Sequence, residues 1–466
     1  MAACTGTCRP PSRREVLRAG ALSWLGIGLA DLLRARALAG TAPAKRPVRG
    51  VILAFCPGGP SHLDTLDPKP DAPREVRGNF GTVATALPGV RVCEHLPRLA
   101  RRLGRLTLVR SMTTTSPVHE LAVHRLLTGV NETPPGTGVA ASRSDRPHLG
   151  ALLAATRPAP PGLPPAVILP TRLTFEGATF PGQNAGFLGA RHDPWHLVGD
   201  PTAPGFGPAN LTPGDDLCVT RLRDRAALLA AVDARRRDLD RQAAGGDLDA
   251  MRRRAVELLT STACRTAFDL GREDPKLRDR YGRTLMGQGL LLGRRLVEAG
   301  VPLVQVNLGD SNVWDTHENN FGRLKGILLP PFDQAVSALI DDLEGRGLWD
   351  EVLVIVTGEF GRTPRVGQPI KGGAGAKPDG RDHWPGVFSL LAFGAGVARG
   401  HVLGASDPLA AFPRTAAYSP ADLAANVLQA LGIDPSGTLA DAFGRPFPVN
   451  AGTPIPWAGR VGTDRR

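Results

Sequence analysis

The sequence lacks three features that would each have pointed to a particular class of protein. Aromatic residues make up only 5% of the 466 residues. None of the six cysteines stands in a CxxC spacing, so we expect no zinc–thiolate site. Beyond the N-terminal region, no segment reaches the roughly 18 consecutive apolar residues of a membrane span, so we expect none in the mature protein.

The composition is that of a globular protein with many loops. Apolar residues account for 42% and charged residues for 21%, and Gly (56) and Pro (43) are abundant. The net charge of +12 is compatible with nucleic acid, anionic lipid or an anionic substrate as partner. The Arg residues are spread along the chain, and no RNA-binding or helix-turn-helix motif accompanies them. We therefore expect solvated helix faces and no nucleic-acid partner, with an anionic substrate still compatible with the charge.

The N-terminal region has the pattern of an export signal. Arg13-Arg14 is followed by a weakly apolar run over 19–30 and by the small-residue pattern Ala37-Leu38-Ala39. This order is typical of a bacterial twin-arginine signal peptide. The alternative is an ordinary helix start with chance arginines. We predict that residues 1–39 are a signal peptide and that the protein is exported to the periplasm or cell envelope.

The rest of the chain alternates between short apolar runs and segments of helical periodicity. The apolar runs predict strands at 49–55, 106–110, 166–169, 301–308, 351–357 and 387–393. The helical pattern covers 96–103, 216–243, 247–270, 276–299, 329–345 and 420–431. This alternation predicts an α/β domain over 47–466, a mostly parallel sheet sandwiched by helices. Residues 216–299 are expected to form a helical insertion that could cap the site, and 131–165, rich in Pro, Gly and Ser, to form surface loops.

Carboxylates and histidines recur in the loops next to the predicted strands, where open α/β sheets bind ligands. These loops contain Asp64, Asp315, His317, Glu359 and His383. A single such residue is more often solvated or a helix cap than a ligand. Four loops of this kind at one sheet edge instead favour one or two divalent metal ions, with Zn, Mn, Ca and Mg all compatible.

Five segments resemble one known family. They are GGPSHLDTLDPKPDAP (58–73), LPRLARRLGRLTLVRSMT (96–113), WDTHENNF (314–321), GEFGRTP (358–364) and GRDHWPGVFS (380–389). The chain resembles the domain of unknown function 1501 family, which is sulfatase-like, twin-arginine-exported and part of the alkaline phosphatase superfamily. The resemblance implies an alkaline phosphatase/sulfatase-like fold. It also implies Asp64, Asp315, His317, Glu359 and His383 as metal ligands, with Phe360 replacing a superfamily histidine.

The resemblance leaves the nucleophile open. In the stretch HELAVHRLLTG (119–129), His119 stands where sulfatases carry the cysteine that becomes formylglycine. A standard sulfatase mechanism is therefore not expected. Three routes remain: a hydroxyl from Thr113 or the residues after it, attack or metal ligation by His119, or attack by water activated at the metal. Arg362 could bind an ester oxygen or form a salt bridge beside the sheet.

These observations predict a metal-dependent hydrolase or transferase of anionic esters, phosphate before sulfate. The expected substrate is a small anionic ester or a sulfated or phosphorylated glycan. The alternative is a catalytically silent, metal-containing binding protein for anionic glycans or envelope partners. The missing Cys or Ser at position 119 and the Phe at position 360 both favour that alternative.

Overall fold

The computed structural model describes residues 48–131, 138–204, 206–207, 224, 227–228, 254–441 and 444–458. The chain divides into one unit up to Arg46 and a second from Pro47 onward, and all that follows concerns the second unit. The predicted signal peptide (1–39) and most of the predicted helix at 216–243 lie outside the described residues. None of the described helices is long and apolar enough to cross a membrane.

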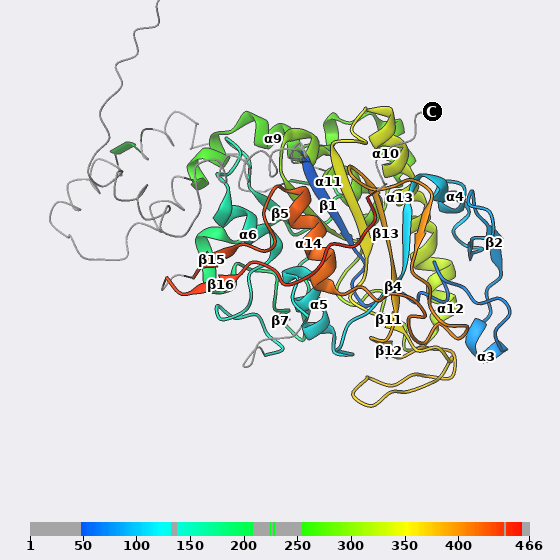
Figure 1. The fold of residues 1–466 in the computed structure, drawn as a ribbon. Coiled ribbons are helices and arrows are strands. Elements are labelled where there is room, and N and C mark those ends of the chain that lie inside the picture. Colours follow the sequence, from blue (N-terminus) through cyan, green and yellow to red (C-terminus); the bar gives the residue numbers. More distant parts are fainter. Residues whose placement is uncertain are drawn as a thin grey trace, which may run out of the picture. The chain divides into compact units, whose positions relative to one another are not determined.

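The centre of the fold is an eight-stranded sheet (Figure 1). Across the sheet the order is β14 (His401–Leu403), β4 (Thr107–Met112), β13 (Phe388–Gly394), β10 (Val352–Thr357), β1 (Gly50–Phe55), β9 (Leu303–Asn307), β5 (Ala166–Leu169) and β8 (Trp195–His196). β13 runs antiparallel to both of its neighbours, and the other pairs are parallel. The predicted fold class, a mostly parallel sheet between helices, is confirmed.

Alternation along β1 divides the core into two layers. Ile52 and Ala54 belong to one apolar cluster, and Val51, Leu53 and Phe55 to the other. Successive side chains of a strand point to opposite faces, so a fully apolar strand needs a helical layer on each side. Each fully buried Val, Leu or Phe stabilises the fold by about 1.5–3 kcal/mol relative to an exposed one.

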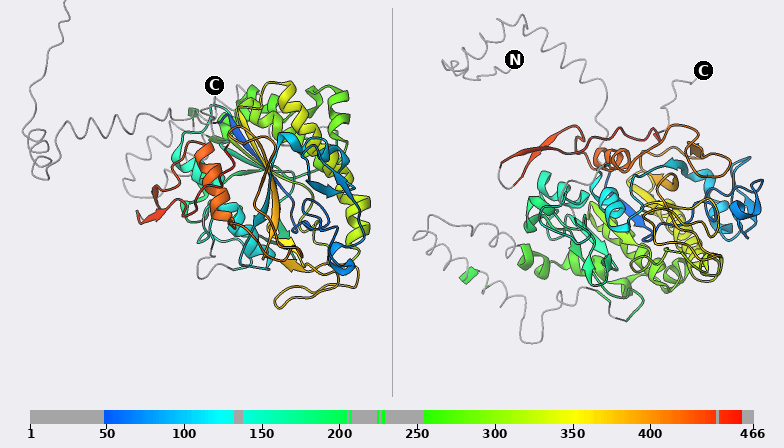
Figure 2. Two further views of the ribbon diagram at one scale, coloured as in Figure 1. Left: turned by 45° about the vertical axis from the view of Figure 1, so that its right-hand side comes forward. Right: turned by 90° about the horizontal axis from the view of Figure 1, so that it is seen from below.

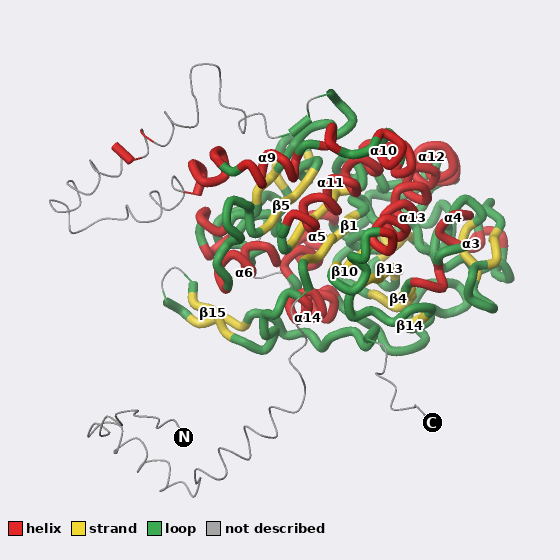
Figure 3. Tube along the Cα trace, turned by 90° about the horizontal axis from the view of Figure 1, so that it is seen from above, coloured by secondary structure: helices red, strands yellow, loops and turns green. Residues whose placement is uncertain are grey.

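Helices cover both faces of the sheet, as the view from above shows (Figure 3). One face carries α11 (Leu285–Ala299), which packs against β1, β9 and α13 (Leu329–Gly345). The other face carries α5 (His119–Thr128), α6 (Leu149–Thr156) and α14 (Pro420–Ala430). The shorter helices are α3 (Arg74–Arg77), α4 (Pro97–Ala100), α9 (Thr262–Phe268), α10 (Pro275–Tyr281) and α12 (Asn320–Arg323).

Two expectations about helices need correction. The segment 131–165 was expected to form surface loops, but it contains α6, whose Leu149 and Leu152 are buried in the core. The segment 276–299 was expected to be one helix, but a turn at Gly282 separates α10 from α11. Because α11 packs on the sheet, this part of the predicted helical insertion belongs to the main helical layer.

A buried ion network joins α10, α11 and α13 at this layer. The Arg294 guanidinium is fully buried and lies 2.9 Å from Asp342 and 2.9 Å from Glu273. The Tyr281 hydroxyl donates to Asp342 at 2.9 Å. Burial and the Asp342 charge raise the pKa of Tyr281 well above its usual value, so the hydroxyl stays protonated as the donor. Arg294 therefore contributes positive charge to Glu273 and Asp342, two carboxylates that are almost fully shielded from water.

Replacing Arg294 with Ala should lower the free energy of unfolding by roughly 3–5 kcal/mol, because Asp342 and Glu273 lose their one fully buried counter-charge and keep only the more exposed Arg295 and Arg346. Arg283→Ala is the matched control, since Arg283 pairs with Asp279 on the surface of the same region, and exposed pairs are worth about 0–1 kcal/mol. Urea denaturation of both variants measures the difference. Equal losses in the two would show that the network contributes no more than a surface pair.

Candidate metal centre

The loops at the carboxyl ends of β1, β9 and β10 meet beside a short two-stranded ribbon. The ribbon consists of β11 (Gly361–Arg362) and β12 (His383–Trp384), with Arg362 opposite His383. It lies at the edge of the molecule to which β1 and β10 point (Figure 1). Asp315 and His317 follow β9 in the loop anchored by the buried Trp314, whose indole donates to Leu308 O at 2.9 Å.

Two groups of side chains gather there at metal-binding distances. The first is His119, Asp315 and His383, and the second is His317, Asp382 and His383; in each group the candidate ligand atoms lie within 4.8 Å of one another. His383 belongs to both groups, and its Nε2 lies 2.8 Å from His317 Nε2. Mixed imidazole and carboxylate donors suit a divalent transition metal such as Zn²⁺ or Mn²⁺.

Asp315 is the carboxylate at the centre of the cluster. It lies 2.8 Å from His317, 3.3 Å from His383 and 3.3 Å from His119. Burial alone would raise its pKa, but the Arg362 charge and the three imidazoles hold the pKa of Asp315 well below its usual value. Asp315 is therefore an anion, in the form that a metal ion requires of a carboxylate ligand.

Glu359 lies behind His119 and belongs to neither group. It is fully buried, and its carboxylate lies 2.6 Å from His119 Nδ1. It also accepts the backbone N–H groups of Gly58 and Gly59. The expectation that Glu359 is itself a ligand is therefore replaced by a positioning role, in which a carboxylate fixes one ring nitrogen and turns the other toward the site.

The second ring nitrogen of His119 faces the site. This Nε2 is buried and lies 3.3 Å from Asp315 Oδ2. Burial lowers the pKa of His119, but hydrogen bonds with Asp315 and Glu359 outweigh it and raise the value to about 9. Phe360, whose ring centroid lies 4.8 Å from that of His119 and 4.7 Å from that of His383, forms an apolar wall against both.

Arg362 acts on Asp315 and not on a substrate. The guanidinium is fully buried and lies 2.5 Å from Asp315. Its other donors bond to the carbonyl oxygens of Gly58, Gly59, Trp314 and Arg381. The salt-bridge interpretation of Arg362 therefore fits the contacts, and the expected binding of an ester oxygen does not.

Gly58 and Gly59 make these contacts because they are glycines. Both have positive φ values, +111° and +69°. A Cβ on Gly58 would lie 2.5 Å from Asp315 N, and a Cβ on Gly59 would lie 2.5 Å from the Phe360 ring. Their N–H groups hold Glu359, and their carbonyl oxygens hold Arg362.

Asp64 is not brought to the cluster, contrary to its expected place among the ligands. Its carboxylate is fully buried and forms an ion pair with Arg381, with Nε at 2.7 Å from Oδ2. Ser61 and Asn320 donate to the same oxygen at 2.7 and 3.0 Å. A buried cation of the chain therefore occupies the place beside Asp64 that a metal was expected to take.

Thr113 also differs from its expected position. It follows β4, and its hydroxyl faces Tyr418 O at 3.4 Å, while its N–H donates to the same oxygen at 2.7 Å. The loop reaches the cluster further on, where Pro117 O lies 2.5 Å from His383 Nδ1. Asp382 was not among the predicted ligands, although the adjacent pair Asp382-His383 is visible in the sequence.

The loop between β11 and β12 extends beyond the rest of the fold (Figure 2). The Asp382 carboxylate accepts the N–H groups of Ile370 at 2.9 Å and Gly375 at 3.2 Å. Gly375 O contacts His317 Nδ1, and Lys377 N donates to His317 O at 2.8 Å. The loop is therefore fastened through two of the candidate ligands.

Asp64→Asn should leave the metal content of the folded protein unchanged and lower the free energy of unfolding by roughly 3–5 kcal/mol, because Arg381 loses its buried counter-charge. Elemental analysis and urea denaturation of the same preparation measure the two effects. Loss of metal from folded Asp64→Asn protein would restore Asp64 as a ligand.

Comparison with known proteins gives one family match and several distant structural matches. One crystal structure is Ps i-CgsB in complex with k-i-k-neocarrahexaose, with 11% identity, a TM-score of 0.40, and 84% of this chain and 73% of that chain covered. Another is the PsFucS1 sulfatase from Pseudoalteromonas sp., with 12% identity, a TM-score of 0.35, and coverage of 91% and 72%. A third is alkaline phosphatase from the Antarctic bacterium TAB5, with 11% identity, a TM-score of 0.34, and coverage of 83% and 99%.

Curated proteins give no match to the sequence. The family profile covers residues 48–456, which is nearly all of the described domain and includes every residue of both candidate ligand groups. The chain therefore belongs to the family described as "Protein of unknown function (DUF1501)".

Proposed function

We propose that the protein is a metal-dependent hydrolase or transferase of anionic esters, with the cluster of His119, Asp315 and His383 at its centre. The observation that carries the proposal is the convergence of two buried histidines and a partly buried anionic carboxylate from three separate segments. Perturbed ionisable groups gathered at the carboxyl edge of an α/β sheet are typical of a functional site.

The cluster fits a divalent cation by its donor chemistry. His119 turns its buried Nε2 toward Asp315 Oδ2, 3.3 Å away, and Asp315 is held anionic. His317 and Asp382 provide a second set of donors around the shared His383. A cation held there would supply Lewis-acid polarisation of an ester oxygen and a lowered pKa for water. The chain's own groups set the geometry: Glu359 orients His119, and Arg362 orients Asp315.

The position of Thr113 favours a route without a hydroxyl nucleophile from that residue. Its hydroxyl faces a carbonyl oxygen of Tyr418 and not the cluster. Position 119 holds His where formylglycine chemistry requires Cys, so we propose phosphate esters ahead of sulfate esters. The substrate class is a small anionic ester or a phosphorylated or sulfated glycan. We also propose export by the twin-arginine pathway, for which the N-terminal pattern of Arg13, Arg14 and Ala37–Ala39 is the support.

One observation favours the alternative, a catalytically silent metal-containing binding protein. Arg362 already bonds to backbone carbonyl oxygens and to Asp315. The loop over 370–377 already forms hydrogen bonds with His317 and Asp382. Arg362, the arginine in contact with Asp315, is then not free to stabilise the charge of a transition state. Turnover measurements separate the two functions.

The proposed function predicts that the protein holds metal. Mature wild-type protein should carry stoichiometric divalent metal, and Asp315→Ala and His383→Ala should both lose it, because each removes a donor from the cluster. His401→Ala is the matched control, since His401 is exposed on β14. Elemental mass spectrometry on folded samples measures the content. A wild type without metal after reconstitution would refute the metal site.

The proposed function also predicts activity on a panel of phosphate and sulfate esters. Metal-loaded wild type should cleave a phosphate monoester faster than the corresponding sulfate. Glu359→Gln should lower metal affinity or activity about 10–100-fold, because His119 loses the partner that orients it.

Thr113→Val is the matched control in the same assay, and it should retain activity. No turnover of any ester by protein shown to hold metal would favour the silent binding protein. Loss of activity in Thr113→Val would return the hydroxyl route.

A further inference from the structure

A cavity separate from the cluster lies among the segment after β1, helix α3 and the hairpin of β2 (Thr82–Ala84) and β3 (Arg91–Cys93). Its volume is about 230 Å³, and its walls include Lys69, Arg77, Arg91 and the ring of Phe80. None of the described residues that line it is acidic. Helix α3 lies toward the same edge of the fold as the β11–β12 ribbon (Figure 1).

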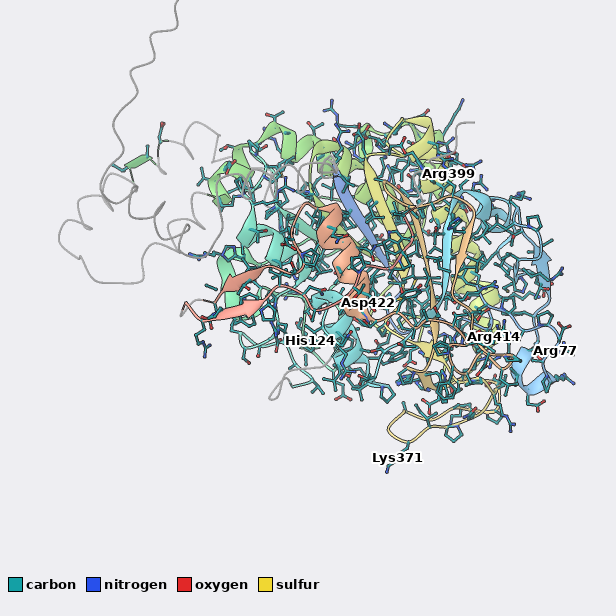
Figure 4. All side chains as sticks on the ribbon, viewed as in Figure 1. Arg77, His124, Lys371, Arg399, Arg414 and Asp422 are labelled. Carbon is teal, nitrogen blue, oxygen red and sulfur yellow. The ribbon has the colours of Figure 1, made fainter. Side chains whose placement is uncertain are left out.

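The charges of this cavity are only partly compensated. Lys69 pairs with Asp67 at 3.1 Å, but Asp67 is shared with Arg110 at 3.2 Å. Arg91 bonds to the side chain and carbonyl of Thr82, which are neutral. Arg77 is exposed on α3 (Figure 4), and the described residues give its guanidinium no ion pair. Like charges around one cavity repel each other, and a bound anion relieves that repulsion.

We propose that this cavity binds an anionic group of a sulfated or phosphorylated saccharide chain. The separate cluster of His119, Asp315 and His383 then acts on another group of the same chain. Action of the cluster on the same chain rests on the proposed function, whereas binding at the cavity does not. Binding at the cavity is measurable without turnover.

The size and walls of the cavity favour a saccharide over a free ion. A volume of about 230 Å³ exceeds several times the roughly 30 Å³ that a water molecule takes in the liquid. Phe80 is held in place by edge contacts with His95 and Phe321, at ring-centroid distances of 4.6 and 5.1 Å. A fixed apolar ring beside cationic groups provides a surface for the C–H face of a sugar as well as for its charged substituent.

The cavity and the cluster are joined through buried contacts. Leu63 lines the cavity, and the next residue, Asp64, pairs with Arg381 at 2.7 Å. Arg381 also donates to Val76 O at 2.8 Å, on the helix that carries Arg77. Arg381 stands two residues before His383 in the chain. The wall of the cavity and the segment that carries His383 are therefore neighbours in the fold, and a ligand that contacts both has to be an extended chain.

The test is calorimetric titration of the mature protein with a sulfated hexasaccharide from κ-carrageenan, its desulfated counterpart, inorganic sulfate and inorganic phosphate. The sulfated chain should bind in a salt-dependent manner, and the desulfated chain should bind at least about tenfold more weakly, because charge-assisted hydrogen bonds are lost. Arg77→Glu should weaken binding of the sulfated chain by about tenfold or more.

Arg74→Glu is the matched control, because Arg74 is exposed on the same short helix and does not line the cavity. Equal weakening by Arg77→Glu and Arg74→Glu would overturn the proposal in favour of diffuse attraction. The proposal would also be overturned if an oligothymidylate of matched charge bound through Arg77 as tightly as the saccharide does. The same holds if the wild type bound no sulfated chain.

His383→Ala separates this inference from the proposed function. It should abolish ester cleavage, while Arg77→Glu should still weaken binding of the sulfated chain by about tenfold in the His383→Ala background, because Arg77 lines the cavity and His383 does not. Retained binding with no turnover in wild type would end the proposed function and keep the binding site. Loss of binding in folded His383→Ala would place the saccharide at the cluster and overturn the separate site. Thermal melts confirm that each variant is folded.

Discussion

The buried guanidinium of Arg362 is the contact on which the geometry of the candidate site depends. It bonds to carbonyl oxygens of the loop after β1, the loop after β9 and the segment before β13, and it pairs with Asp315. A planar group with five donors can hold several acceptors in fixed directions, which a lysine cannot do. Three loops that are distant in sequence are therefore held in one arrangement by a single charge.

A second buried cation, Arg381, does the same for the outer part of the site. It joins Asp64 to the carbonyl oxygens of Val76, Thr363 and Pro364. Two buried arginines thus each neutralise one carboxylate, and each uses its remaining donors on backbone oxygens. Buried charges without partners are costly, so this arrangement makes the loop structure depend on Asp64 and Asp315 being ionised. The same arrangement removes both arginines from contact with a substrate.

The fold was readable from the sequence because its strands are short, continuous apolar runs. Such runs identify strands buried on both faces, and β1, β5 and β10 begin and end within a residue of their predicted bounds. Helix α6 was not predicted because Pro and Gly dominate the sequence around it. Its apolar residues form a helix because they pack on β5, which the local sequence does not reveal. Asp315, His317 and His383 could be placed together because strand order brings their loops to one edge. Asp64 and Glu359 could not be assigned, because their partners, Arg381 and His119, are more than 200 residues away along the chain.

His383 belongs to both candidate ligand groups. Its Nδ1 contacts Pro117 O in the segment before α5, and its Nε2 faces both Asp315 and His317. In the first group, His119 and Asp315 are held by Glu359 and Arg362 and not by the loop between β11 and β12. The second group is fastened to that loop through Asp382 and His317. Residues of the first group would therefore hold a cation without disturbing these loop contacts, whereas a cation at the second group would compete with the backbone contacts that Asp382 and His317 make to the loop.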